Sequence, residues 1–138
     1  MPLPPDSRRE LGDGFSICSL PIGLWQLSGG HGRIDRNAAA ESLFDYIDHG
    51  YTTLDMADHY GPAEEIYGDF RGRLREQRGE EALANVQAMT KWCPSPGPMT
   101  REVVEDAVRV SLRRMDVTCL DVLQFHWWDY DDPRYLDA

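Results

Sequence analysis

Four side chains that can carry or move a proton stand at the ends of short apolar runs in this 138-residue sequence. An acid and a phenol share the segment after one run, an amine ends a second run, and an imidazole ends a third. In chain order they are Asp55, Tyr60, Lys91 and His126. The set suits proton transfer to a carbonyl oxygen, because that oxygen becomes an alkoxide and needs a proton when hydride reaches the carbon.

The four side chains have complementary parts in such a transfer. A phenol on its own, with a usual pKa of about 10, donates protons slowly at neutral pH. An ammonium group beside a phenol favours the phenolate and makes a better acid. We therefore expect Lys91 to stand beside the proton donor Tyr60, and Asp55 to hold Lys91 charged and in place. A neutral histidine can orient a substrate oxygen, which is the part expected of His126.

Strands and helices alternate along the chain, as judged from apolar spacing and from cap and turn signals. Asp35 and Thr100 suit helix N-caps, while Glu64 and Glu65 suit the positive end of a helix dipole. The helix over 36–49 has an expected buried face of Ala39, Leu43, Tyr46 and Ile47. The expected elements are a hairpin over 10–18, strands over 19–27, 51–55, 85–90 and 119–126, and helices over 36–49, 62–77 and 101–115.

This alternation predicts an α/β fold with parallel strands and right-handed crossovers. Two architectures stay open on the pattern alone: a doubly wound sheet, and an eight-fold β/α barrel cut near its middle, since a whole barrel needs about 250 residues. In both, the carboxyl ends of the strands meet at one rim where ligands bind, and the four candidate side chains belong to those ends. We expect residues 1–9 to form a loose arm and 10–138 a partial domain.

Composition and charge exclude several classes of protein. The net charge of −10 disfavours nucleic-acid partners, because like charges repel. No apolar run approaches the length of a membrane span, and the start lacks the apolar core of a secretory signal. The three widely spaced cysteines indicate reduced thiols. We therefore expect no membrane or nucleic-acid partner and a cytoplasmic location, with import into an organelle left open.

A metal-centre interpretation uses an overlapping set of side chains. The candidate ligands of such a hydrolytic barrel are Asp55, Asp58, His59 and His126. No H-x-H or H-x-x-x-H pair supports it, and it leaves Lys91 unexplained. We therefore expect no metal, with Asp58 and His59 as loop residues at the rim and His31 and His49 at the surface.

Several segments resemble, in order, motifs of the aldo-keto reductase family. "PIGLWQLSG" is similar to its first-strand segment, and "DMADHYG" to the signature in which Asp and Tyr lie five positions apart. "TK" at 90–91 and "SLRRMDVTCLDVLQFHW" at 111–127 are similar to its later motifs. The resemblance covers about residues 10 to 130, and the first hairpin is similar to the one that plugs the bottom of the family's barrel.

The resemblance implies an α/β fold that is the N-terminal half of a (β/α)₈ TIM barrel with an N-terminal β-hairpin. It implies interconversion of small carbonyls and alcohols with NADPH or NADH. The residues it assigns are catalytic Asp55, Tyr60, Lys91 and His126, cofactor-binding Gly23, Trp25 and Asp55, and pocket-lining Trp25 and Trp127. Trp92 belongs to the predicted substrate pocket because it lies near the same rim. Family members continue through four more strands that supply most cofactor contacts, so the chain matches half of an active site.

Two functions from different classes stay open. One is an NAD(P)H-dependent oxidoreductase, of which this chain is a fragment or a truncated form with reduced or no activity alone. The other is a non-catalytic module that senses cofactor or regulates a partner. Half a barrel exposes strand edges, and such edges favour pairing with another chain or with a second copy.

Overall fold

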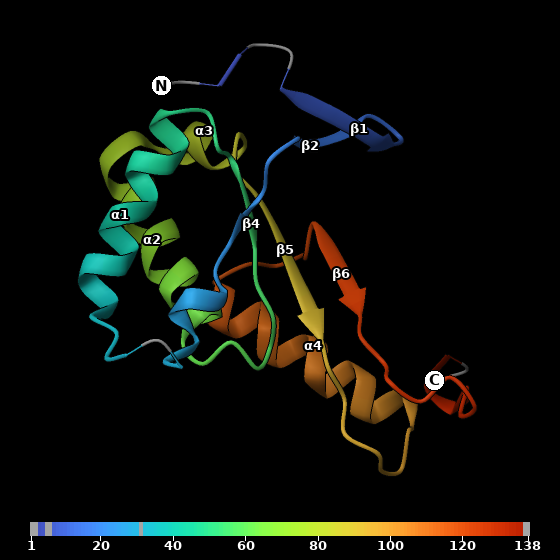
Figure 1. Ribbon diagram of the computed structural model, residues 1–138. Helices are drawn as coiled ribbons and strands as arrows, with labels where there is room; N and C mark the ends of the chain where they lie inside the picture. Colours follow the sequence, from blue (N-terminus) through green and yellow to red (C-terminus); the bar gives the residue numbers. More distant parts are fainter. Residues whose placement is uncertain (1–2, 5–6, 31, 137–138) are drawn as a thin grey trace.

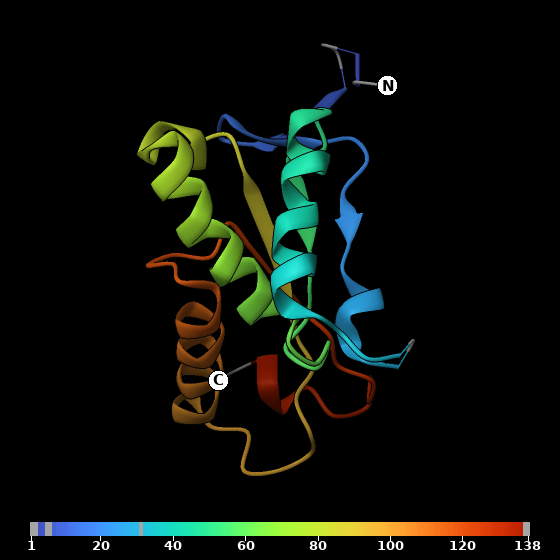
Figure 2. The same cartoon turned by 90° about the vertical axis from the view of Figure 1, so that its left-hand side faces the viewer.

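A computed structural model describes residues 3–4, 7–30 and 32–136, and it places a β-hairpin beside a four-stranded sheet whose helices cover one face (Figures 1 and 2). The first half of the chain holds β1 (Arg8–Gly12), β2 (Phe15–Cys18), β3 (Ile22–Gly23), η1 (Trp25–Ser28), α1 (Arg36–Asp48) and β4 (Thr53–Asp55). The second half holds α2 (Ala63–Arg78), α3 (Glu80–Leu83), β5 (Gln87–Trp92), α4 (Arg101–Met115), β6 (Val122–Phe125) and η2 (Arg134–Leu136).

The sheet has the strand order of a β/α barrel. The order is β3-β4-β5-β6, and each neighbouring pair is parallel. Helices α1, α2 and α4 connect successive strands and lie on the same side of the sheet (Figure 2). A doubly wound sheet instead reverses its order at a switch point and carries helices on both faces. The α/β class is confirmed, and the architecture is half of a (β/α)₈ barrel.

The two faces of β5 have different surroundings, because successive side chains of a strand point to opposite sides. Thr90 donates a hydrogen bond to Glu64 of α2, and Trp92 packs in a cluster with Val103 and Val104 of α4. These two residues therefore face the helices. Lys91, between them, faces the other side, which corresponds to the interior of a complete barrel.

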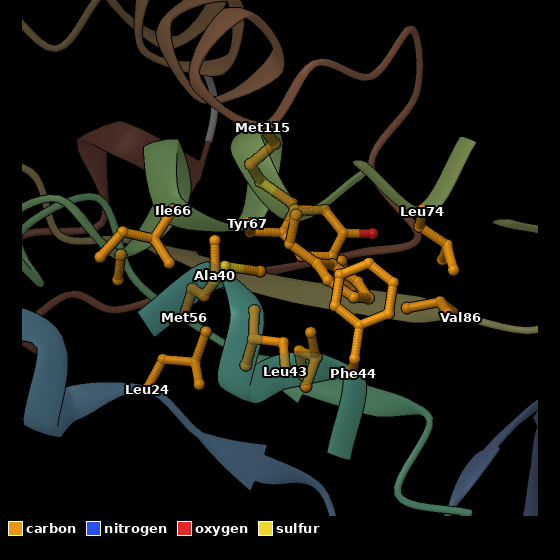
Figure 3. Packing of buried hydrophobic residues seen from close by; sticks show 14 of the residues in the cluster. Leu24, Ala40, Leu43, Phe44, Met56, Ile66, Tyr67, Leu74, Val86 and Met115 are labelled. Carbon is orange, nitrogen blue, oxygen red and sulfur yellow. The ribbon is translucent and has the colours of Figure 1, made fainter. Parts of the chain in front are cut away.

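The main core lies between the sheet and the helices α1 and α2 (Figure 3). Phe44 of α1 meets Phe70 of α2 edge to face, with ring centroids 5.1 Å apart. Tyr67 of α2 is buried in the same cluster, and burial raises the pKa of its phenol. The Phe44–Phe70 pair joins α1 to α2, and Leu54 of β4 and Ala88 of β5 pack in the same cluster, so the helices are held against the strands that carry the candidate site.

The hairpin lies at the end of the sheet where the strands begin (Figure 1). The Arg8 guanidinium of β1 donates hydrogen bonds of 3.0 Å to Thr52 and of 3.0 Å to Gln87. Cys18 of β2 donates its backbone N–H to the Thr53 hydroxyl at 2.8 Å. These bonds attach the hairpin to the strands β4 and β5 at the end of the sheet opposite the candidate site, as expected for a hairpin that covers the bottom of a barrel.

The strand boundaries differ from the prediction in five places. The run over 19–27 forms only a two-residue strand, followed by the 3₁₀-helix η1, because Leu24 turns inward and starts a helical turn. β4 and β6 are shorter than predicted, and β5 continues to Trp92, so that Lys91 lies inside the strand. β1 begins at Arg8, two residues before the predicted hairpin and inside the predicted arm.

The helices agree with the prediction in position and differ in detail. The Asp35 carboxylate caps α1 at Ala38 N, and the Thr100 hydroxyl caps α4 at Val103 N. The buried face of α1 is Ala40, Leu43 and Phe44, whereas the predicted Tyr46 is exposed. The predicted face was shifted around the helix because Phe44, and not Tyr46, meets the aromatic side chains of α2. None of the helices in the described part of the chain could cross a membrane.

Candidate functional site

Asp55 and Lys91 form an ion pair on the inner face of the sheet. The Lys91 Nζ lies 2.7 Å from Asp55 Oδ2 and also donates to the Met56 carbonyl oxygen at 2.7 Å. The pair is sheltered, with side-chain exposures of 13% for Lys91 and 24% for Asp55. Asp55 is paired in register with Met89, so Lys91 stands two residues further along the neighbouring strand and reaches back to the carboxylate.

Gln124 of β6 completes the hydrogen bonding of the Asp55 carboxylate. Its Nε2 donates to Asp55 Oδ1 at 3.0 Å, while Lys91 occupies Oδ2. Gln124 is paired in register with Lys91, so both side chains leave the sheet on the same face. Gln124 is not among the residues predicted from the sequence, although an amide inside an otherwise apolar strand is the kind of signal that could reveal it.

Tyr60 lies beside this ion pair in the loop between β4 and α2. The Lys91 Nζ is 5.1 Å from the centroid of the Tyr60 ring. Trp25 of η1 packs edge-on against the same ring, with centroids 4.9 Å apart. The next residue, Gly61, has φ +53°, and a Cβ there would stand 2.7 Å from the Ser28 carbonyl oxygen. Only glycine allows the loop to approach η1 this closely, and the close approach holds Tyr60 between Trp25 and Lys91.

His126 follows β6 at the same end of the sheet. Its backbone N–H donates to the Trp92 carbonyl oxygen at 2.9 Å, which continues the sheet by one bond. The imidazole packs against Trp128 with ring centroids 4.1 Å apart. Among the described residues, no hydrogen bond or ring contact joins His126 to Tyr60, Lys91 or Asp55. The structure therefore brings three of the four predicted side chains into contact and places the fourth at the same rim.

Of the three tryptophans predicted to line a pocket, Trp92 and Trp127 lie in one cluster and Trp25 lies apart from them. Trp25 is 47% exposed beside Tyr60. Trp92 points toward the helices and packs on Tyr135 with centroids 5.1 Å apart, and Trp127 packs on the same ring at 5.2 Å. Trp92 follows Lys91 directly in β5, so the alternation of a strand turns it away from the face that Lys91 occupies. A cavity of about 460 Å³ opens next to His126 and is lined in part by Trp127 and Trp128.

Asp58 and His59 interact with each other and with the backbone of β5. The Nδ1 of His59 lies 2.9 Å from Asp58 Oδ1, and Asp58 Oδ2 accepts the backbone N–H of Cys93 at 3.1 Å. His59 is exposed at the rim, and His49, the C-cap of α1, is exposed at the surface, whereas His31 lies outside the described residues. The described residues contain no group of three His, Cys, Asp or Glu side chains that could hold a metal ion.

Glu64 at the start of α2 is buried, which the sequence did not indicate. The carboxylate accepts a hydrogen bond of 2.7 Å from the Thr90 hydroxyl and pairs with Arg114 of α4 at 3.2 Å. Glu64 and Glu65 both stand in the first turn of α2, where the helix dipole favours them, as expected. No local pattern could have revealed the ion pair, because its partners are separated by 50 positions in the chain.

The inner face has open space beside Asp55. Gly23 of β3 is paired in register with Asp55, and a Cβ at Gly23 would meet no atom within 4 Å. The exposed Trp25 side chain stands at the same edge. An open face next to a carboxylate and an aromatic ring leaves room for a planar group to approach Asp55.

Comparisons with known proteins agree with this geometry. The chain is 28% identical to the 6-dehydroglucose reductase of Novosphingobium aromaticivorans. The alignment covers 99% of this chain and 48% of that reductase. It is 29% identical to a protein of Arabidopsis thaliana named "Probable voltage-gated potassium channel subunit beta", of which it covers 37%. It also matches a solved structure described as "Putative aldo-keto reductase from Pseudomona aeruginosa", with TM-score 0.72 and 25% identity, over 96% of this chain and 51% of that one.

The chain thus spans about a third to a half of the length of the curated relatives it matches. The family model of the Aldo/keto reductase family matches residues 19–138, which include every element of the parallel sheet and its helices. With the strand order and the ion pair at the strand ends, this match places the chain in the aldo/keto reductase family.

Proposed function

We propose that this chain provides the proton-donating part of an NAD(P)H-dependent oxidoreductase that interconverts small carbonyls and alcohols. The observation that supports this most directly is the arrangement of Lys91, whose Nζ is bound to Asp55 at 2.7 Å and lies 5.1 Å from the centroid of the Tyr60 ring. A phenol is suited to supplying a proton to an alkoxide when an ammonium group, held in place by a carboxylate, lies next to it.

In reduction, Tyr60 donates its phenolic proton to the carbonyl oxygen, and a hydride adds to the carbonyl carbon. Lys91 stabilises the negative charge left on the Tyr60 oxygen, and Asp55 keeps the ammonium in place. His126, at the same rim, orients the substrate oxygen by a hydrogen bond. In the oxidation direction the same groups act in reverse, with Tyr60 taking the alcohol proton.

The nicotinamide, when bound, supplies the hydride. On this chain Gly23, Trp25 and Asp55 would hold it, because they surround the open part of the inner face. Trp25 is also suited to contact an apolar or aromatic carbonyl substrate. The choice between NADPH and NADH depends on contacts to the adenosine part, and the residues of this chain favour neither.

Replacement of Tyr60 by phenylalanine tests the proposal. Turnover is measured with the protein that carries this chain, using NADPH and NADH in turn with a panel of aldehydes and ketones. Tyr60→Phe should lower kcat by about 100-fold or more, because general acid catalysis typically contributes 10²–10⁴-fold, while cofactor affinity stays unchanged. Tyr46→Phe, at an exposed position on α1, is the matched control and should retain full turnover. Equal turnover of Tyr60→Phe and the wild type would contradict the mechanism.

A second candidate function is a non-catalytic module that binds the cofactor and regulates a partner. One relative is named "Probable voltage-gated potassium channel subunit beta", and a module that only regulates a partner would require no turnover. Leu123 and Phe125 of β6 are about two-fifths exposed at the open edge of the sheet, which favours pairing with another chain or a second copy. Cofactor titration and the mass in size-exclusion chromatography separate the candidates: a dimer that binds NADPH and reduces no carbonyl supports the module.

A further inference from the structure

An ion pair with a buried carboxylate lies behind the candidate site, on the side of the sheet that faces the helices. Glu64 of α2 is 1% exposed, and its carboxylate lies 3.2 Å from Nη1 of Arg114 of α4, whose side chain is 35% exposed. The hydroxyl of Thr90 donates to the other carboxylate oxygen at 2.7 Å. Burying a carboxylate costs desolvation that a single ion pair only partly recovers, so stability alone is a weak reason for a charge at this position.

The ion pair is connected to the loop that carries Tyr60. Arg114 Nη1 also donates to the Asp58 carbonyl oxygen at 3.1 Å. Asp58 in turn donates its backbone N–H to the Lys91 carbonyl oxygen at 2.9 Å, and its carboxylate accepts the N–H of Cys93 at 3.1 Å. The segment two residues before Tyr60 is therefore held from both sides, by β5 and by the guanidinium of Arg114.

The pair is also connected to the strand that carries Lys91. Thr90, which directly precedes Lys91 in β5, uses its hydroxyl to bind Glu64. Arg114 thus binds the loop that carries Tyr60, and Glu64 binds the strand that carries Lys91. Both contacts lie on the side of the sheet away from the face that a substrate would occupy. A displacement of about 1 Å in such a site can cost about 100-fold in rate, so this attachment matters for catalysis.

We propose that Glu64 and Arg114 are positioning residues that set the placement of Tyr60 relative to Lys91. The expected effect on kcat rests on the proposed function. The expected effect on the placement of Tyr60 rests on the geometry alone. The competing explanation is that the pair only binds α4 to α2. The two explanations differ in what happens when the buried charge is removed together with its partner.

Three variants separate the explanations. Arg114→Met leaves the Glu64 carboxylate buried without its cation, so it should lower the urea midpoint strongly. Glu64→Gln combined with Arg114→Met removes that uncompensated charge and should recover most of the midpoint, while the bond to the Asp58 carbonyl stays lost. Arg113→Met, at the exposed neighbouring position of the last turn of α4, is the matched control. It should change neither the urea midpoint nor the bond between Arg114 and the Asp58 carbonyl oxygen.

The NMR resonance of the Tyr60 ring, measured in the folded double variant, distinguishes the two explanations. A loss of stability alone would leave its chemical shift unchanged. With ¹³C-labelled tyrosine, assigned through Tyr60→Phe, this signal reports the placement of the ring beside Trp25. We expect it to shift in the double variant and to stay in place in Arg113→Met. A recovered midpoint with an unshifted Tyr60 signal would overturn the proposal, and this arm needs no turnover.

Kinetics adds the catalytic consequence. In the double variant kcat should fall by about 10-fold to 100-fold with the KM for cofactor unchanged, because the placement of the acid is altered and the cofactor contacts are not. A shifted Tyr60 signal with wild-type kcat would overturn the catalytic part. If the wild type itself shows no turnover, the proposed function fails, and the resonance still decides whether Glu64 and Arg114 position Tyr60.

Discussion

Two glycines of α2 allow a controlled test of how closely α2 and α4 pack. At Gly68 a Cβ would stand 2.4 Å from the Arg114 carbonyl oxygen and 3.4 Å from the carbonyl carbons of Arg114 and Met115. At Gly72, one turn later in the same helix, a Cβ would meet nothing within 4 Å. Ordinary carbon–oxygen contacts lie at about 3.3–3.6 Å, so alanine at Gly68 forces a backbone displacement of about 1 Å between the helices.

The magnitude follows from comparing the two alanine variants. Gly→Ala in a helix interior stabilises by about 0.5–1 kcal/mol, and this gain is common to both positions. Overpacking costs about 1–3 kcal/mol and applies only at Gly68, where the clash is with backbone and no side chain can rotate away. Gly72→Ala should therefore be more stable than the wild type, and Gly68→Ala less stable than Gly72→Ala by about 1–3 kcal/mol.

Urea unfolding followed by far-UV circular dichroism measures the difference. The comparison is valid if the dependence of the free energy of unfolding on urea is the same for both variants, since a change in midpoint alone then reports stability. Equal midpoints for Gly68→Ala and Gly72→Ala would refute the close approach of α2 to α4. The same result would weaken the case for Arg114 as a positioning residue, because its carbonyl oxygen forms that contact.

Two further predictions concern pH and the carboxylate of the site. Burial raises the pKa of Tyr67 above its value of about 10 in the unfolded chain. Between these two pKa values the folded state binds more protons than the unfolded state. The contribution of Tyr67 to stability is therefore full below about pH 10 and is lost as the pH rises through the folded pKa. Tyr67→Phe should remove that part of the alkaline loss, as measured by urea midpoints at several pH values, and an identical alkaline slope in both proteins would contradict it. Gln124→Leu removes the donor to Asp55 Oδ1, and kcat should fall about 10-fold with little change in KM, since a hydrogen bond to a charged group contributes about 1.5–3 kcal/mol. A wild-type kcat in Gln124→Leu would show that Lys91 alone holds the carboxylate.

The convergence of Asp55, Tyr60 and Lys91 could be predicted because it depends on parallel strands more than on side-chain detail. Once β4 and β5 pair in parallel, residues at their carboxyl ends must lie together, whatever the helices do. The same reasoning placed His126 at the rim. It could not place the imidazole next to Tyr60, because the position of the ring depends on the loop after β6 and its contact with Trp128.

Trp92 shows a prediction that a stricter use of the sequence would have refined. Its assignment to the pocket rests on its expected position near the rim, directly after Lys91. If Lys91 faces the interior of the barrel, strand alternation requires the next residue to face the helices, and the structure places Trp92 there. The Glu64–Arg114 pair is different in kind. Its two members lie on separate helices, and only the packing of α2 against α4 brings them together.

The distribution of these contacts indicates which part of the chemistry this chain can hold without further elements. The phenol, the ammonium and the carboxylate are positioned by η1, β4, β5, β6 and the loop between β4 and α2. The proton donation that we propose therefore depends on residues of this half of the barrel. For the proposed hydride donor, the described residues offer an open face beside Gly23 and the exposed ring of Trp25. Binding of cofactor should thus be the weaker function of the isolated chain, while the geometry around Tyr60 should already be formed without it.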